Sequence, residues 1–211
     1  QARVHSVERV QNQTLWRSYA VHRQSILMRE GGESRPAAAA RLVREDDEVL
    51  LGTAHGQSIR FKVQDVRPMG RGTRGVRGVS LQGDDHVVGL DVIEDQEEQQ
   101  VLAVSANGYG KRTPLEDYRV QKRGGQGIIT IRTSDRNGPV VGVAQVVVDD
   151  ELMLITNAGK VLRCPVSGIS TMGRATQGVR IMDLAPDETL VAIARLAEGD
   201  VSEGDGSSGA A

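Results

Sequence analysis

The chain has 211 residues with 25 glycines, 2% aromatic residues and a formal net charge of −2 at pH 7. With so few aromatic side chains, the core has to be built from Val, Leu and Ile, which suits thin β-sheets. A single cysteine, Cys164, excludes an intramolecular disulfide framework and fits a reducing compartment. No apolar run approaches the roughly 20 residues of a membrane helix and no signal peptide opens the chain, so we expect a cytoplasmic protein.

The first part of the chain, residues 1–44, is predicted to hold a short helix and a linker. Leu15, Trp16, Tyr19 and Ile26 fall near one side of an amphipathic helix over residues 10–29. A glycine pair at 31 and 32 ends this helix, and residues 33–44, with one proline and four alanines, are typical of a linker.

From residue 45 the sequence repeats. A loop that combines arginine with glycine occurs three times, and its last glycines, Gly75, Gly127 and Gly178, are 52 and 51 residues apart. Other features keep the same register, which an internal repeat requires. A turn glycine recurs at 56, 108 and 159, and a strand arginine recurs at 60, 112 and 163.

Each repeat contains four short β-like runs bounded by Gly, Asn and Asp turns. A period near 50 residues with four strands predicts an all-β fold of propeller or β-pinwheel type, with one four-stranded antiparallel blade per repeat. We expect the blades at residues 45–96, 97–147 and 148–197, which together form the domain 45–197. Residues 198–211, rich in Gly, Ser and acidic side chains, are predicted to be a disordered acidic tail.

The basic residues are concentrated in the repeats, although the net charge is small. Residues 60–77 hold six basic residues against one acid, 111–132 hold six against two, and 160–180 hold four and no acid. A single Lys or Arg on a strand is most often only part of a solvated face. Recurrence of arginine beside glycine is more specific, because backbone amides without side chains and a guanidinium can both approach a phosphate.

At these residues the chain resembles the C-terminal β-pinwheel domain of the A subunit of bacterial DNA gyrase, with the A subunit of topoisomerase IV as a close relative. The resemblance rests on residues 67–78, 107–114 and 172–180. The family's characteristic loop has the form Gln-Arg-Arg-Gly-Gly-Lys-Gly. Here residues 121–127 follow it, with Lys122 in place of the first Arg and Gln126 in place of the Lys.

The resemblance implies a sequence-independent DNA-binding domain that wraps duplex DNA around its basic perimeter and supports supercoiling by a type II topoisomerase. Its implied partners are double-stranded DNA, the gyrase B subunit, and the N-terminal region of the gyrase A subunit, in a nucleoid-associated setting. The domain is then not an enzyme on its own, and no cofactor or metal is expected. A closed propeller needs about four or more blades, so three repeats predict an open arc, self-association to complete the ring, or a truncated or fused gene product.

The residues predicted to contact DNA lie in the repeated glycine loops or on the adjacent strands. They are Arg60, Arg71, Arg74, Arg77, Lys111, Arg112, Lys122, Arg123, Gly124, Gly125, Gly127, Arg163, Arg174 and Arg180.

Two other interpretations of the sequence are possible. A protein-interaction β-propeller without DNA binding is the alternative function, but the Trp-Gly signatures of regulator-of-chromosome-condensation repeats are missing and Trp16 lies outside the repeats. Residues 8–28 resemble the start of poly(ADP-ribose) polymerase catalytic domains. None of the downstream NAD-binding segments follows, so no ADP-ribosylation activity is assigned and a packing helix is favoured there.

Overall fold

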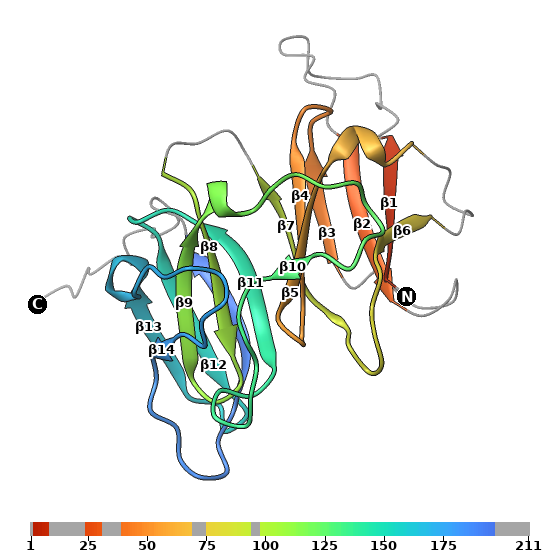
Figure 1. Ribbon diagram of the computed structural model, residues 1–211. Coiled ribbons are helices and arrows are strands. Elements are labelled where there is room, and N and C mark those ends of the chain that lie inside the picture. The colour runs from red at the N-terminus through yellow and green to blue at the C-terminus, as the bar shows by residue number, and fades with distance from the viewer. Residues whose placement is uncertain (1, 9–23, 31–38, 69–74, 94–97, 197–211) are drawn as a thin grey trace, which may run out of the picture.

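The computed structural model describes residues 2–8, 24–30, 39–68, 75–93 and 98–196, with side chains from residue 40 onward. Within these ranges the chain is built of short β-strands in antiparallel sheets, and three of the connections contain a single turn of 3₁₀ helix (Figure 1). The all-β, propeller-like fold class predicted from the repeats is confirmed.

The strands and 3₁₀ turns follow one another in a regular order. The strands are β1 Ala2–Glu8, β2 Gln24–Glu30, β3 Ala39–Val43, β4 Glu48–Thr53, β5 Gln57–Lys62, β6 Val76–Val79, β7 Val87–Ile93, β8 Gln100–Ser105, β9 Tyr109–Pro114, β10 Ile128–Ile129, β11 Val140–Val146, β12 Glu151–Thr156, β13 Val161–Pro165, β14 Val179–Arg180 and β15 Leu190–Leu196. The 3₁₀ turns are η1 Val63–Asp65, η2 Leu115–Asp117 and η3 Val166–Gly168.

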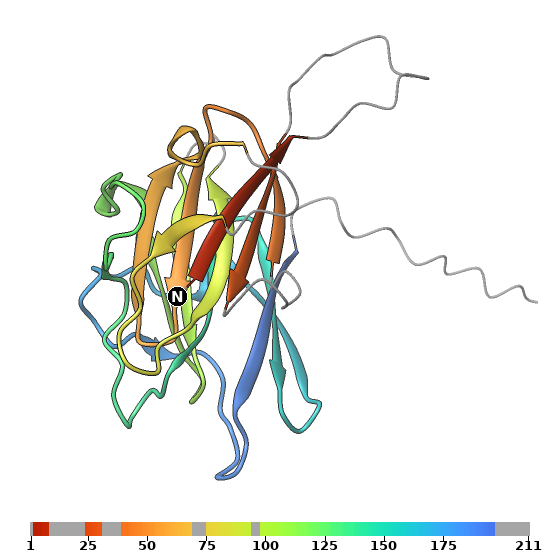
Figure 2. The same ribbon diagram turned by 90° about the vertical axis from the view of Figure 1, so that its right-hand side faces the viewer.

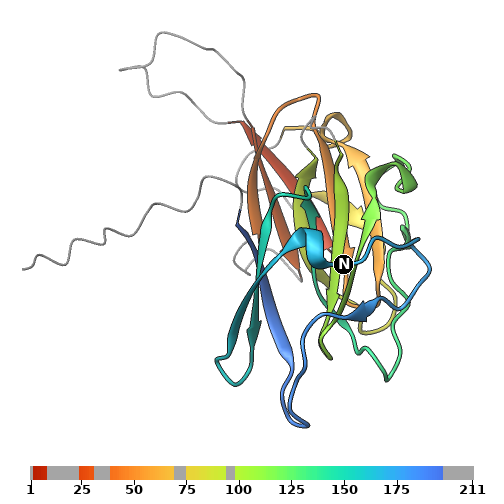
Figure 3. The same ribbon diagram turned by 90° about the vertical axis from the view of Figure 1, so that its left-hand side faces the viewer.

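The described strands form four sheets, with the orders β3-β2-β1-β6, β10-β5-β4-β7, β11-β8-β9-β14 and β13-β12-β15. We call them the first to fourth sheets. The first and fourth lie at opposite ends of the molecule in Figure 1. Figure 2 views the molecule from the side of the first sheet, and Figure 3 from the side of the fourth.

Each repeat gives one strand to the sheet before its own. β10 of the second repeat pairs with β5 of the first, with Ile128 opposite Ser58, and β14 of the third repeat pairs with β9 of the second, with Val179 opposite Gly110. β6 pairs in the same way with β1. The prediction that each repeat forms one complete blade is therefore wrong in this respect. The reason is that the second strand of each hairpin would otherwise have an unpaired backbone edge, which the next repeat covers.

The N-terminal part also differs from the prediction. The helix expected over residues 10–29 is wrong at its C-terminal end, because residues 24–29 lie in β2, and the expected linker includes β3. Both strands join the first sheet together with β1, so residues 1–44 and the first repeat share a sheet. Residues 9–23, which carry most of the polymerase-like segment, and the predicted tail lie outside the described residues.

Three apolar clusters fill the spaces between neighbouring sheets. Val49 and Leu51 of β4 pack in the cluster shared with the first sheet, whereas Leu50, on the other face, packs in the cluster shared with the third. β8 repeats this arrangement, with Val101 facing the second sheet and Leu102 the fourth. Alternate residues of a strand point to opposite faces, so a central strand between two sheets is apolar on both.

The two edges of the sheets have different surroundings. The strands at one edge, β7, β11 and β15, pack against the neighbouring sheet's corresponding strand, and β3 packs against β7. In this inner region the Asp91 carboxylate accepts a hydrogen bond from the backbone N–H of Gln145 at 2.8 Å. The Arg195 guanidinium donates to the backbone carbonyl of Gln145 at 3.2 Å. The opposite, outer edge is formed by β6, β10 and β14 and by the glycine loops that lead to β10 and β14.

The repeated turn glycines occupy equivalent positions, as predicted. Gly56, Gly108 and Gly159 each follow the first strand of a hairpin and have φ values of 79°, 80° and 78°. This left-handed conformation is accessible to glycine at little cost.

Two of these glycines allow a matched test of the fold. An added Cβ at Gly108 would collide with the Met182 carbonyl oxygen, whereas one at Gly159 meets nothing within 4 Å. Gly159→Ala should therefore cost only the backbone strain, about 1–2 kcal/mol. Gly108→Ala should cost about 1–3 kcal/mol more, since the neighbouring backbone has to move. Urea unfolding of both variants measures the difference. Equal losses would mean that packing beside Gly108 contributes nothing.

Candidate nucleic-acid interface

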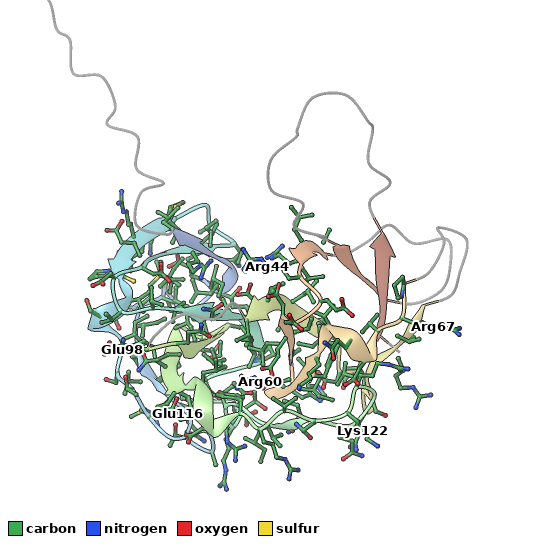
Figure 4. All side chains as sticks on the ribbon, turned by 90° about the horizontal axis from the view of Figure 1, so that it is seen from above. Arg44, Arg60, Arg67, Glu98, Glu116 and Lys122 are labelled. Carbon is green, nitrogen blue, oxygen red and sulfur yellow. The ribbon has the colours of Figure 1, made fainter. Side chains whose placement is uncertain are left out.

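The glycine loop of the second repeat, residues 121–127, runs along the outer edge. Lys122 is exposed there, and in Figure 4 it lies at the periphery near Arg67, whereas Arg44 lies on the opposite side of the molecule. Arg123 is anchored to the preceding repeat, because its Nε donates to the Asp65 carbonyl at 2.7 Å and its Nη1 to the Arg77 carbonyl at 3.2 Å.

Glycine is required in this loop by its backbone. Gly124 and Gly127 have φ values of 82° and 83°. A Cβ at Gly127 would also collide with the Ser58 carbonyl, because the loop runs directly over β5. Gly125 is exposed, and its carbonyl accepts a hydrogen bond from the Ser80 amide at 2.8 Å. Backbone contacts therefore hold the loop in place, leaving its Lys122 side chain free for solvent.

The third loop, residues 173–178, makes an equivalent contact. Arg174 Nη1 donates to the Ile129 carbonyl at 3.2 Å, and Ile129 stands 52 residues after Arg77, the acceptor of Arg123. Arg123 and Arg174 thus occupy matching positions at successive steps along the outer edge. The first loop cannot be compared, because Arg71 and Arg74 lie outside the described residues.

Lys111 does not reach the surface, contrary to its predicted place in the DNA interface. Its side chain is fully buried, and Nζ donates to the carbonyls of Gly173 at 2.6 Å and Arg174 at 2.5 Å. Burial, together with the nearby Arg174 charge, lowers the pKa of Lys111 to about 8. The lysine therefore secures the third glycine loop from below and is unavailable to a phosphate.

Two of the three strand arginines are clamps between repeats. Arg60 Nη1 donates to the carbonyls of Leu115 at 3.2 Å and Tyr118 at 3.1 Å, at the 3₁₀ turn of the next repeat. Arg112 does the same one repeat later, with Nε donating to the Ile169 carbonyl at 2.7 Å. Arg112 is only 8% exposed, so the structure does not support the predicted DNA contact for this residue.

The third strand arginine, Arg163, has the same place in its hairpin but different surroundings. Arg60, Arg112 and Arg163 stand opposite Leu50, Leu102 and Met153 in their strand pairs. Arg163 pairs with Glu151 as Arg60 pairs with Glu48, but its side chain is 48% exposed against 17% for Arg60, because no later 3₁₀ turn packs over it in the described part of the chain. The predicted equivalence therefore holds for strand register and fails for environment.

Lys111, Arg60 and Arg112 thus hold neighbouring repeats together, and other basic side chains on the outer strands and loops face solvent. The predicted residues in this group are Arg77, Lys122 and Arg180, with Arg123 and Arg174 partly exposed. The list of predicted DNA contacts omits Arg67 and Arg119, which are both exposed. These two arginines are 52 residues apart, so the repeat spacing could have identified them as equivalent positions.

Another missed residue, Arg136, has no counterpart in the other repeats. Its guanidinium carbon lies 4.9 Å from the centre of the Tyr109 ring, and that of Arg180 lies 5.6 Å from it. Arg180 also donates to the Tyr109 hydroxyl at 3.2 Å. Hydrogen bonding by Arg180, and next by Arg136, together with their positive charges, lowers the pKa of Tyr109.

The requirements of a metal site and of a membrane span can both be compared with the described residues. No group of three or more His, Cys, Asp or Glu side chains is placed to hold a metal ion within those ranges. The described helical turns are all too short to cross a membrane.

Comparison with known proteins agrees with the repeats and the sheet architecture. Residues 47–94, 99–146 and 150–197 each match the family described as DNA gyrase C-terminal domain, beta-propeller. The chain belongs to the DNA gyrase C-terminal domain family.

Curated relatives and solved structures extend the comparison. The DNA gyrase A subunit of Staphylococcus epidermidis is 46% identical over 162 residues, and that of Staphylococcus aureus 45% over 160. These alignments cover 77% and 76% of this chain but 18% of each relative, so the chain spans about a fifth of their length. A structure of the DNA gyrase A C-terminal domain superimposes with a TM-score of 0.74 at 25% identity, covering 93% of this chain and 66% of that one. The C-terminal domain of DNA topoisomerase IV shares the fold, with a TM-score of 0.71 at 19% identity over 76% of this chain and 50% of that one.

The buried lysine of this family member gives a pH-dependent prediction. The pKa of Lys111 is about 8 in the folded chain against 10.5 for an ordinary lysine, so between these pH values the unfolded chain binds more protons. The free energy of unfolding should therefore rise with pH in this window, at up to about 1.4 kcal/mol per pH unit. Lys111→Met should lack this rise. Urea unfolding of both proteins from pH 7.5 to 9.5 gives the difference between their free energies of unfolding, in which the contributions of shared groups such as Tyr118 cancel. If this difference in free energy does not change with pH, the lowered pKa of Lys111 is wrong.

Proposed function

We propose that this domain binds duplex DNA along its outer edge, without sequence specificity, and bends the duplex around the stack of sheets. The observation that carries the proposal is the repeated position of Arg123 and Arg174 on that edge, in a member of the gyrase C-terminal domain family. Successive loops at equal steps present positive charge along a track, which is the requirement for following a DNA backbone.

The chemistry of the edge favours contacts to phosphate over readout of bases. Base stacking needs exposed aromatic rings, but the aromatic residues of the described chain, Phe61, Tyr109 and Tyr118, are buried. The outer strands β10 and β14 are two residues long and offer no recognition helix for the major groove. Binding then depends on charge and on the deformability of the duplex.

Bending DNA costs on the order of 1–6 kcal/mol for a site of 20–30 base pairs, and phosphate contacts have to offset this cost. In our proposal the exposed cations supply those contacts, while the clamps at Arg60 and Arg112 keep the sheets at fixed angles. A rigid stack fixes the curvature of the bound duplex, and therefore the direction in which it leaves the domain.

The similarity to DNA gyrase A subunits supports a proposal for the wider role. We infer that the domain serves as an accessory part of an ATP-dependent type II topoisomerase, working with the gyrase B subunit, and with the N-terminal region of the gyrase A subunit. It has no catalytic role of its own in this proposal. The wrapped segment would be presented to the cleavage region with one handedness, so that strand passage introduces negative supercoils. We place the domain at the bacterial nucleoid.

Exposed cations on the two sides of the molecule test the proposal. Lys122→Gln and Arg67→Gln remove charge from the outer edge, and Arg44→Gln is the matched control from the opposite side (Figure 4). Each outer variant should lower the slope of log affinity against log salt by about 0.9 for a lost phosphate contact, equally for unrelated duplex sequences. Arg44→Gln should leave the slope unchanged. Fluorescence anisotropy with labelled duplexes from 50 to 200 mM salt measures all three.

Other results would contradict the proposal in different ways. Absence of binding at low salt would favour a protein-interaction propeller. If an outer variant loses affinity for one duplex sequence alone, the side chain reads bases. An unchanged slope with a lower melting temperature would mean that the outer cations serve the fold, which exposed side chains rarely do.

A further inference from the structure

The junction between the second and third repeats carries an arrangement that the other described junctions lack. Tyr109 begins β9 and is 6% exposed, yet two arginines from different repeats lie against its ring. Arg136 comes from the loop between β10 and β11, and Arg180 from β14. Both arginines are exposed, so the buried ring fixes two solvent-facing guanidinium groups beside each other.

We propose that Arg136 and Arg180, held on Tyr109, form a second contact point for DNA phosphates beside the third glycine loop. The inference rests on the proposed DNA binding, and it adds Arg136, which has no basic counterpart in the other repeats, to Arg180 of the outer strand β14. The site takes a phosphodiester oxygen pair, because a guanidinium presents a planar fork of donors that matches this geometry.

The loop that carries Arg136 is held from both sides. Asn107 Nδ2 donates to the carbonyls of Asp135 at 3.1 Å and Arg136 at 3.2 Å. On the other side Asn137 Nδ2 donates to the Gln177 carbonyl at 3.1 Å, and Gln177 Nε2 donates to Ser134 Oγ at 3.2 Å. Since Gln177 belongs to the third glycine loop, the position of Arg136 is tied to the loop that carries Arg174.

Donors remain free on both side chains. Arg180 uses Nη1 on Asp183 at 3.0 Å and Nη2 on the Tyr109 hydroxyl. The Arg136 guanidinium donates a long hydrogen bond of 3.5 Å to Gln177 Oε1 and also interacts with the Tyr109 hydroxyl. A guanidinium has five N–H donors, so each arginine can still donate two hydrogen bonds to one anion. The Asp183 side chain is 86% exposed, and so does not shield the pair from solvent.

The sequence register shows that the arrangement belongs to one junction. At the positions equivalent to Tyr109 the other repeats have Gln57 and Lys160, neither of which has an aromatic ring. At the positions equivalent to Arg136 they have acids, Asp84 and Asp187. This junction therefore gains positive charge where its neighbours have negative charge.

A double variant, Arg136→Gln with Arg180→Gln, tests the inference on the whole chain with a random-sequence duplex as the probe. The slope of log affinity against log salt should fall by about two units, one for each lost contact, with little change in melting temperature. Tyr109→Phe keeps the ring and both charges and should leave the slope unchanged. Arg44→Gln is again the control from the opposite side.

The outcomes separate this inference from the proposed function. If the wild-type chain binds and Lys122→Gln lowers the slope but the double variant does not, the second contact point is excluded and DNA binding stands. If the double variant melts earlier at an unchanged slope, the arginines brace the junction and contact no phosphate. If the wild-type chain does not bind duplex at any salt concentration, both proposals are wrong.

Discussion

The architecture depends on one constraint, the pairing of the exposed edge of each hairpin by the repeat that follows. The second strand of a hairpin has backbone donors and acceptors on its outer side that need partners. The next repeat supplies them through β10 and β14, each only two residues long. To reach that edge, the chain has to cross the outside of the preceding sheet in a tight loop. The loop runs so close to β5 that Gly127 has no room for a side chain.

This crossing also explains where the arginines go. A loop that passes over a neighbouring sheet brings the side chain of its arginine beside carbonyls of the preceding repeat, as with Arg123 and the Arg77 carbonyl. On the strands beneath, Arg60 and Arg112 donate in the opposite direction, to the 3₁₀ turn of the following repeat. Neighbouring repeats are therefore connected by backbone pairs and by charged donors acting both ways. Such mutual contacts are how repeat proteins gain stability from their interfaces.

Much of the fold could be predicted from the sequence, because the strongest signals were local. The turn at Gly108 follows from glycine chemistry, and its 52-residue register with Gly56 follows from counting. Strand exchange could not be predicted, since a periodic sequence does not state which sheet a two-residue strand joins. The first sheet was missed for another reason: β2 contains Leu, Met, Arg and Glu, which favour helices in isolation, and pairing with two neighbouring strands overrides that preference.

The candidate interface was harder to predict than the fold, because burial depends on distant partners. Lys111 and Lys122 are both lysines of the second repeat, but one is enclosed by carbonyls 62 and 63 residues later and the other is exposed. Arg136 was not predicted for a different reason: the other repeats have acidic residues at the equivalent positions, so the repeat pattern does not indicate a basic residue there. The repeat pattern therefore identifies the scaffold, whereas the distribution of charge over it is set by residues that break the pattern. Because those residues sit on a rigid frame, the edge can vary in charge from one junction to the next without altering the path of the backbone.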